Sequence, residues 1–294
     1  MGCRRWLIWC ALAVLALGWS APQAALPVAV SVLPQKTLVE RIGGERVKVR
    51  VLVGRGASPA TYDPSPRQLA ELSGSRVYFR VGVPFESTWL PRLRRLMPAM
   101  EVVDLRDGVE LLELAEHDHD HHHDDRHEQG PEAPAPDPHL WTSPRRAQTM
   151  ADTICDTLVR LDPDAAEHYR ARHARLVAEL EAVDRDLRRR LADVKGGSFL
   201  VFHPAWGYFA DDYGLNQVAI ERRGRSPGPA GLAAVIRQAR AAGARLVVVQ
   251  REFGQGDARA VAEAIDGRVE VLDPLSPAYF ETLRRAAAVM AEAL

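Results

Sequence analysis

The sequence predicts an α/β fold of two lobes, each built on a parallel sheet, joined by a long rigid backbone helix. Three observations favour this fold. The chain has 294 residues, 47% of them hydrophobic and 26% charged, which is enough for two modest lobes with their own cores. Short β-branched runs alternate with helical patterns, as in parallel βαβ units. Between two such series lies one helical pattern far longer than the mean of about 11–12 residues.

The first 25 residues have the pattern of a secretory signal peptide. Two arginines precede an apolar run from Trp6 to about Trp19, and small residues follow up to Ala25. The alternative is a membrane anchor, but the run is shorter than the roughly 20 residues that a spanning helix needs. We therefore expect residues 1–25 to be removed and the mature protein to be soluble in the periplasm.

Cysteine content and charge limit the classes of partner. Cys3 and Cys10 fall in the leader, so the mature chain keeps Cys155, which is expected to be a buried small hydrophobe, and forms no internal disulfide. The formal net charge is -1, so composition favours neither nucleic acid nor an anionic membrane as a partner. We expect a monomer.

The N-terminal lobe is expected over residues 26–161, with strands and helices in alternation. The strands are predicted at 28–33, 47–53, 77–81 and 101–105, and the helices near 35–42, 66–74, 87–97 and 143–161. A histidine-rich loop, residues 115–137, interrupts this series before its last helix.

The connecting helix is expected over residues 162–195. Asp162 and Pro163 are strong helix-start residues, with Asp162 as the predicted cap. Apolar residues then keep mostly helical spacing until Gly196 and Gly197 end the pattern. The spacing predicts a helix of about 30 residues, on the order of 45 Å long. Because bending such a helix costs hydrogen bonds, we expect the lobes to move little when a ligand binds.

The C-terminal lobe is expected over residues 196–294, where the alternation of strands and helices resumes. The strands are predicted at 198–202, 217–220, 245–249 and 268–272, with helices between them, including ones from 229 and 257, and a closing helix that ends at 294.

Three candidate ligands stand where loops of the two lobes converge. His203 follows the strand 198–202, Asp273 follows the strand 268–272, and His139 lies in the loop before the helix near Pro144. Ligands of parallel sheets bind beyond the carboxyl ends of the strands. Two imidazoles and a carboxylate suit zinc. The alternatives are structural histidines and an Asp273 that merely starts the last helix. We expect a metal site in the interlobe cleft.

A dense histidine tract precedes His139. It alternates histidine with aspartate, and the proline-rich stretch "PEAPAPDP" follows it. Such composition favours a mobile loop on an extended spacer. Either the loop is simply solvated, or its imidazoles collect Zn²⁺ reversibly and lose it on protonation near a pKa of roughly 6.5. The candidate accessory ligands are His117, His119, His121, His122, His123 and His127.

An ordered set of segments resembles the solute-binding proteins of metal-uptake ABC transporters, the cluster A-I family, and especially its zinc-binding branch. The segments are "SVLPQKTLVERIGGERVKVRVLVGRGASPATYDPSPRQL", "RVGVPFESTWLPRL", "DPHLWTSPRRA", "FHPAWGYFADDYGL" and "VLDPLSPAYFETLRR". The resemblance covers nearly the whole mature chain. It implies two βα lobes joined by a long helix, and it implies a histidine-rich loop at the position found here.

The resemblance also implies the metal ligands. The family histidines fall on His139 and His203, and the family aspartate falls on Asp273. A further family histidine is replaced by Ala60, which cannot coordinate a metal. The three remaining ligands leave a fourth position for water or for a histidine of the loop. Asp63 is a weaker candidate, because the family acid there is usually structural.

The predicted function is capture of Zn²⁺ and its delivery to a membrane ABC permease, without catalysis. A manganese or iron carrier is the first alternative, although His203 disfavours it because harder ions prefer a carboxylate. A zinc-dependent hydrolase with an open three-ligand site is the second, with Glu221 and Glu252 as acid–base candidates. The third is an adhesin or zinc-buffering surface protein that lacks a transporter.

Overall fold

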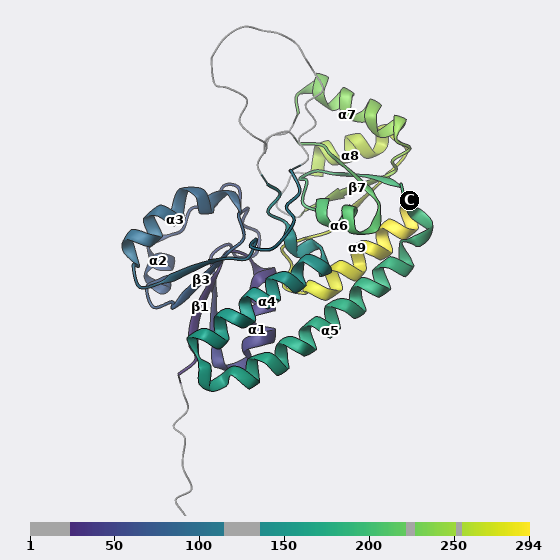
Figure 1. Cartoon of the computed structure of the whole chain (residues 1–294). Helices are drawn as coiled ribbons and strands as arrows, with labels where there is room; N and C mark the ends of the chain where they lie inside the picture. The colour runs from purple at the N-terminus through teal and green to yellow at the C-terminus, as the bar shows by residue number, and fades with distance from the viewer. Residues whose placement is uncertain (1–23, 115–135, 222–226, 251–254) are drawn as a thin grey trace, which may run out of the picture.

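Two four-stranded parallel sheets form the two lobes of the protein (Figure 1). The computed structural model describes residues 24–114, 136–221, 227–250 and 255–294. The strand order is β2-β1-β3-β4 in the first sheet and β6-β5-β7-β8 in the second. The same order of connections recurs in both sheets, and all eight strands coincide with predicted ones. The predicted α/β class with two parallel sheets is confirmed.

The N-terminal lobe alternates strands and helices as predicted. Its elements are β1 (Leu26–Val30), α1 (Leu33–Gly43), β2 (Val47–Val51), α2 (Pro66–Leu72), β3 (Val77–Arg80), α3 (Pro84–Leu96), β4 (Glu101–Asp104) and α4 (Pro144–Leu161). Proline occupies the first turn of all four helices, where its fixed φ fits and its missing N–H has no helical partner to lose.

The C-terminal lobe follows the long helix α5 (Ala166–Arg190). Its elements are β5 (Ser198–Val201), α6 (Gly207–Tyr213), β6 (Asn216–Ala219), α7 (Pro229–Ala241), β7 (Leu246–Val249), α8 (Gln255–Ala264), β8 (Arg268–Val271) and α9 (Tyr279–Ala293). Among the described residues, no helix is both long and apolar enough to cross a membrane.

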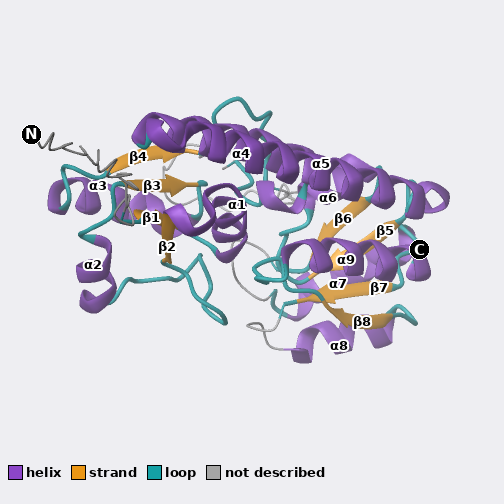
Figure 2. Cartoon of the chain, turned by 90° about the horizontal axis from the view of Figure 1, so that it is seen from below, coloured by secondary structure: helices purple, strands orange, loops and turns teal. Residues whose placement is uncertain are grey.

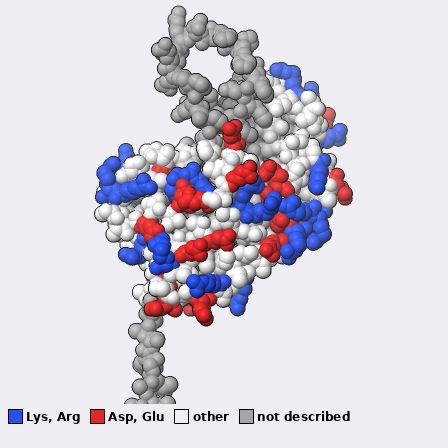
Figure 3. Space-filling model, viewed as in Figure 1, with Lys and Arg blue, Asp and Glu red and all other residues white. Residues whose placement is uncertain are grey.

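The helix α5 runs alongside both lobes (Figures 1 and 2). Its buried stripe of Leu176, Leu180, Val183 and Leu187 follows the spacing of one helical face. This helix packs against α1 and α4 of the first lobe and against α9, which closes the second. Its outer face carries i,i+3 and i,i+4 ion pairs, and charges of both signs are interspersed over the side seen in Figure 3.

The continuous α-helix is shorter than the predicted range of 162–195. It has 25 residues, or roughly 37 Å, and 3₁₀ turns at Pro163–Ala165 and Ala192–Val194 flank it. Asp162 stands at the N-cap position of the first 3₁₀ turn, as predicted, but its side chain makes no capping hydrogen bond. The Asp162 carboxylate instead accepts hydrogen bonds from the Arg46 guanidinium and from the Tyr169 hydroxyl at 2.8 Å.

One apolar cluster runs through both lobes. It contains Val28 and Phe79 of the first sheet, Leu180 of α5, and Phe199 and Val201 of β5. Leu200 of β5 and Phe202, which directly follows the strand, belong to a second cluster under α7 and α8, as expected for a strand buried on both faces. The lobes therefore share a core along α5 and α9, although each has its own sheet.

Candidate metal site

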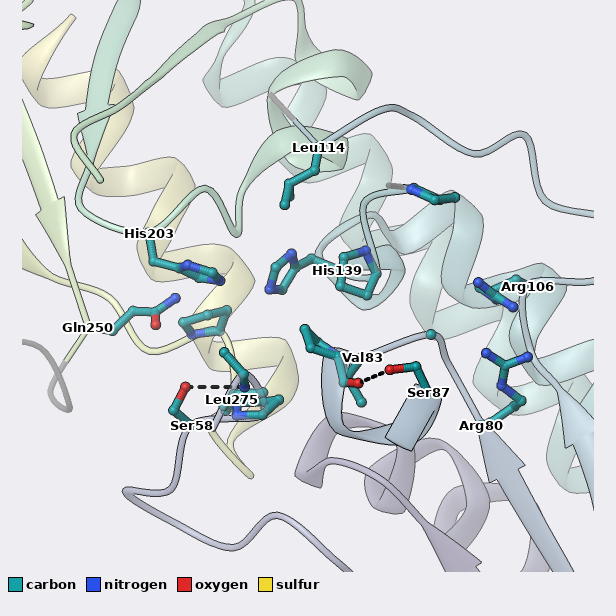
Figure 4. Close-up of a pocket in the computed structure, with 17 residues that line it drawn as sticks. Ser58, Arg80, Val83, Ser87, Arg106, Leu114, His139, His203, Gln250 and Leu275 are labelled. Atoms are coloured by element: carbon teal, nitrogen blue, oxygen red, sulfur yellow. Dashed lines mark hydrogen bonds between the residues drawn. The ribbon is translucent and has the colours of Figure 1, made fainter. Parts of the chain in front are cut away.

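Loops from both lobes enclose a cavity of about 410 Å³, which we call the interlobe cavity (Figure 4). Ala60 and Val83 line it from the first lobe, and His203, Gln250 and Leu275 line it from the second. These loops follow the carboxyl ends of β2, β3, β5, β7 and β8, the edge at which ligands of parallel sheets bind.

His139 is nearly buried in the wall of the interlobe cavity, with an exposed fraction of 7%. Its Nδ1 lies 2.7 Å from Oδ1 of Asp137, and the same oxygen accepts the His139 backbone N–H at 2.9 Å. Asp137 is held in turn by Tyr208, whose hydroxyl donates to the Asp137 carbonyl oxygen at 2.8 Å. Burial raises the pKa of Tyr208 to about 12, so this hydroxyl keeps its proton at neutral pH.

His203 faces His139 across the cavity. Their ring centroids are 5.2 Å apart in an edge-to-face arrangement with an interplanar angle of 75° (Figure 4). The Nδ1 atom of His203 forms a short hydrogen bond with Oε1 of Glu221, a buried residue that follows β6. His139 and His203 are thus each oriented by a carboxylate, His139 by Asp137 and His203 by Glu221.

The two carboxylates select the histidine tautomer. An ionised carboxylate can accept hydrogen bonds but cannot donate them, so each Nδ1 carries the proton and donates it. The ring lone pair then resides on Nε2, which is the nitrogen available to bind a metal. Metal-binding histidines commonly have this arrangement, in which the second ring nitrogen donates to a carboxylate.

Asp273 follows β8 as predicted, but the structure does not bring it to the two histidines. Its Oδ1 accepts the Leu275 backbone N–H at 2.8 Å, and the residue borders a neighbouring cavity of about 320 Å³. It does not start the last helix either, because α9 begins at Tyr279. Within the part of the chain that the structure describes, no three His, Cys, Asp or Glu side chains are placed together for a metal ion.

Neither Ala60 nor Asp63 offers a free ligand atom to the interlobe cavity. Ala60 lines the interlobe cavity and contributes a methyl group to it. Asp63 accepts a hydrogen bond from the Trp89 indole N–H at 2.9 Å, so its carboxylate has a structural role. The cavity wall at Ala60 is therefore left without a side-chain donor atom.

The sequence left several contributors unassigned. The sequence pattern did not single out Asp137, although it stands two residues before His139, a spacing at which an aspartate often binds the following backbone N–H. Glu221 was considered only as an acid–base group, although its place after β6 puts it on the same rim as His203. Arg80 and Arg106, which also line the cavity, had no signal in the sequence because most arginines are solvated.

Some predicted residues lie outside the described part of the chain. These are the leader up to residue 23, Glu252, and the six tract histidines His117, His119, His121, His122, His123 and His127.

The fold and the paired histidines define a two-lobe α/β binding protein whose ligand cavity lies between the lobes. The chain belongs to the ZnuA family, the zinc-uptake complex component A periplasmic proteins, whose family model matches residues 28–293. The resemblance predicted from the sequence segments is thereby confirmed.

Solved structures agree with this assignment. A crystal structure of ZnuA is 35% identical, with a TM-score of 0.82, and the match covers 92% of this chain and 99% of that one. A zinc-bound crystal structure of a ZnuA deletion mutant is also 35% identical, with a TM-score of 0.81, and the match covers 92% and 98%.

Curated relatives share less sequence. The high-affinity zinc uptake system protein ZnuA of Bacillus subtilis is 27% identical over 277 residues, which cover 90% of this chain and 86% of that protein. The zinc-binding lipoprotein AdcA of Streptococcus pneumoniae is 27% identical over 257 residues, covering 85% of this chain and 50% of that protein. The chain thus spans about half the length of the AdcA relatives that it matches.

We expect Gly207→Ala to disturb the support of His139. A Cβ atom at Gly207 would lie 2.7 Å from Oδ2 of Asp137, so the carboxylate or the helix α6 must shift. The free energy of unfolding should fall by about 1–3 kcal/mol, as for other overpacked sites, when measured by urea denaturation.

The matched control is Gly74→Ala, where a Cβ would meet nothing within 4 Å. Its effect should stay within about 0.5 kcal/mol. Equal losses in the two variants would contradict the close contact between Gly207 and Asp137.

Proposed function

We propose that this chain is a periplasmic solute-binding protein that captures Zn²⁺ and delivers it to an ABC permease for import. The observation that carries the proposal is the pair His139 and His203, which face each other with both Nδ1 atoms held by carboxylates. Neutral imidazole nitrogen is a preferred zinc ligand. Membership of the ZnuA family supports the same cargo and the same kind of transport.

The proposed ligand set is His139, His203 and Asp273. The first two are already oriented, whereas Asp273 must leave its hydrogen bond with the Leu275 N–H to reach the metal. Its neighbours Pro274 and Leu275 line the interlobe cavity, so the chain already approaches the site at this point. With Ala60 in the wall, the fourth tetrahedral position falls to a group that is not a side chain of the cavity.

The alternatives receive less support from the geometry. A manganese or iron carrier would favour a carboxylate over the imidazole of His203. A hydrolase needs an acid–base group near the metal-bound water, but the Glu221 oxygen hydrogen-bonds to His203 Nδ1 and therefore serves the histidine. We propose that the protein catalyses no reaction, in keeping with a family of transport components.

The histidine tract is proposed to collect zinc for the cavity. Its six histidines and neighbouring carboxylates precede the site in sequence by about a dozen residues. Neutral imidazoles bind zinc reversibly, and the affinity falls as they protonate. We propose an accessory role for these histidines, because the cavity supplies two oriented imidazoles of its own.

We expect alanine substitutions to rank the proposed ligands. His139→Ala and His203→Ala should each weaken zinc binding by roughly 100-fold or more, since each removes a direct ligand where even an indirect one is worth about 10–100-fold. Asp273→Ala should weaken zinc binding less, by about tenfold, because Asp273 must give up its hydrogen bond with the Leu275 N–H before it can bind the metal. The measurement is a competitive zinc titration.

The matched control is His173→Ala. His173 lies on α5, away from the cavity, with its Nε2 bonded to Asp152 at 2.7 Å. This variant should bind zinc like the parent protein. The ligand assignment is wrong if the two cavity variants also bind zinc as the parent does.

Glu221→Gln tests whether the carboxylate tunes His203. Glutamine can still accept the Nδ1 hydrogen bond, but it lacks the negative charge that a carboxylate places behind a metal-binding imidazole. Zinc affinity should fall by about 10–100-fold while the free energy of unfolding changes little. Glu181→Gln, an exposed residue on α5, serves as the control, and identical affinities in both variants would contradict the proposed tuning.

Deletion of residues 117–127 tests whether the tract is accessory. The deleted protein should still bind one Zn²⁺ tightly in a competitive titration, because the cavity ligands remain. At scarce zinc, however, the cavity should load more slowly than in the intact protein. If tight binding disappears, the tract supplies a required ligand or the cavity is not the primary site.

A further inference from the structure

The wall of the interlobe cavity is unusual for a site that is to hold a dication. Among its described lining residues there is no aspartate and no glutamate, whereas Arg80 and Arg106 both contribute. Figure 4 shows these two arginines on the first-lobe side of the cavity, with His139 between them and His203. Two guanidinium groups therefore face the cavity on the side opposite His203.

A shared carboxylate holds the two guanidinium groups in place. Asp104 accepts hydrogen bonds from Arg106 Nε at 2.9 Å and Nη2 at 2.7 Å, and from Arg80 Nη1 at 2.9 Å. Burial alone would raise the pKa of Asp104, but the hydrogen bonds from Arg106 and the charge of Arg80 hold it below its usual value. Asp104 is thus ionised at neutral pH, with its oxygens committed to the arginines.

A second carboxylate stands behind Arg80 and is saturated by other donors. The Glu86 side chain is fully buried. It accepts the backbone N–H groups of Val81 at 2.9 Å and Gly82 at 2.8 Å, the Ser31 hydroxyl at 2.5 Å, and Arg80 Nε at 3.2 Å. Four hydrogen bonds exhaust the acceptor capacity of this group, so it offers nothing to the cavity.

Each guanidinium keeps one terminal nitrogen for another acceptor. Within the described residues, Arg80 Nη2 and Arg106 Nη1 have no protein acceptor, since the other nitrogens take the bonds to Asp104 and Glu86. Gly82 makes room for the second of these, because a Cβ there would lie 2.8 Å from Arg106 Nη1. Two guanidinium groups with donors to spare favour a carboxylate partner.

The coordination position that the protein leaves open on zinc suits a carboxylate ligand. His139, His203 and Asp273 would fill three of four positions, and the carboxylates of Asp137 and Glu221 are held by the two histidines and do not reach the metal. The cavity is also too large for an ion alone, since its 410 Å³ lies in the range of roughly 300–1,000 Å³ typical of small-molecule sites.

We propose that Zn²⁺ occupies the interlobe cavity together with a small di- or tricarboxylate. One carboxylate group takes the coordination position that Ala60 leaves open on the metal, and a second receives the N–H groups of Arg80 and Arg106. This inference rests on the proposed zinc site and names the form in which the cargo is bound. A monocarboxylate does not suffice, because the arginines and His203 stand on opposite sides of the cavity (Figure 4).

Equilibrium dialysis of the full mature chain against radiolabelled citrate tests the proposal. With equimolar Zn²⁺, the protein should retain citrate at about one molecule per chain, and without metal it should retain at least tenfold less. Labelled acetate should not be retained in either case. Absence of zinc-dependent citrate retention would overturn the proposal.

Arg106→Gln separates this site from citrate held elsewhere, for instance by zinc on the histidine tract. The variant should retain at least tenfold less citrate, whereas its affinity for zinc in carboxylate-free buffer should rise by about two- to tenfold, because a positive charge near the metal is removed. Arg67→Gln, an exposed arginine on α2, should match the parent protein in both measurements.

Two further results count against the proposal. If Arg106→Gln retains citrate like the parent, the arginines do not hold the anion. If the variant loses both citrate retention and zinc affinity, the substitution has damaged the cavity. The expected combination of lower citrate retention and higher zinc affinity is then wrong. Failure of the zinc site itself is recognised separately, because His139→Ala and His203→Ala are titrated without any carboxylate present.

Discussion

Two buried hydrogen bonds of one tryptophan connect the rims of the two lobes, and the geometry of the site depends on them. The Trp141 indole N–H donates to the Pro274 carbonyl oxygen at 2.8 Å, and the Tyr279 hydroxyl donates to the Trp141 carbonyl oxygen at 2.8 Å. These bonds join residues more than 130 positions apart in sequence. His139 stands two residues before Trp141, and their rings contact edge to face at 5.3 Å. The contact between Trp141 and the segment after β8 thus helps to set the position of His139. A substitution at Trp141 or at Tyr279 should therefore change the geometry of the cavity.

The sequence was sufficient to locate the rim, and less so to place the side chains on it. Strand ends can be predicted from β-branched runs, so His203 and Asp273 were both expected at the carboxyl edge, and they are found there. The direction of a side chain depends on local hydrogen bonds that the pattern does not specify. Asp273 turns onto the Leu275 N–H, whereas His203 is held by Glu221, a residue 18 positions away. The same limit applies at the end of α4, where Asp162 occupies the expected cap position but its carboxylate binds Arg46 of a distant segment.

Arg80 and Arg106 show why residue type alone could not give the electrostatics of the cavity. An arginine in a sequence is most often a solvated surface residue, and nothing near these two distinguishes them. Their position follows from Asp104 at the end of β4, which binds both, and from Glu86, which is enclosed by backbone N–H groups and the Ser31 hydroxyl. Only the parallel pairing of β3 with β4 puts Arg80 beside Asp104. The charge of the wall is therefore a property of the sheet and its register.

The shared core decides how a bound ion can leave. The apolar cluster that contains Val28 and Phe79 also contains Leu180 of α5 and Phe199 of β5, so separating the lobes would expose apolar surface at about 25 cal/mol per Å². If the protein is the proposed zinc carrier, it would not release its cargo by wide opening of the lobes. Release of zinc would then proceed by replacement of its ligands, and the proposed site does not supply all four of them. Ala60 supplies no ligand, and Asp273 has a competing partner in the Leu275 N–H. Under the proposed function, weak or external ligands at two of four positions would let zinc pass to a better donor set without large motion of the lobes.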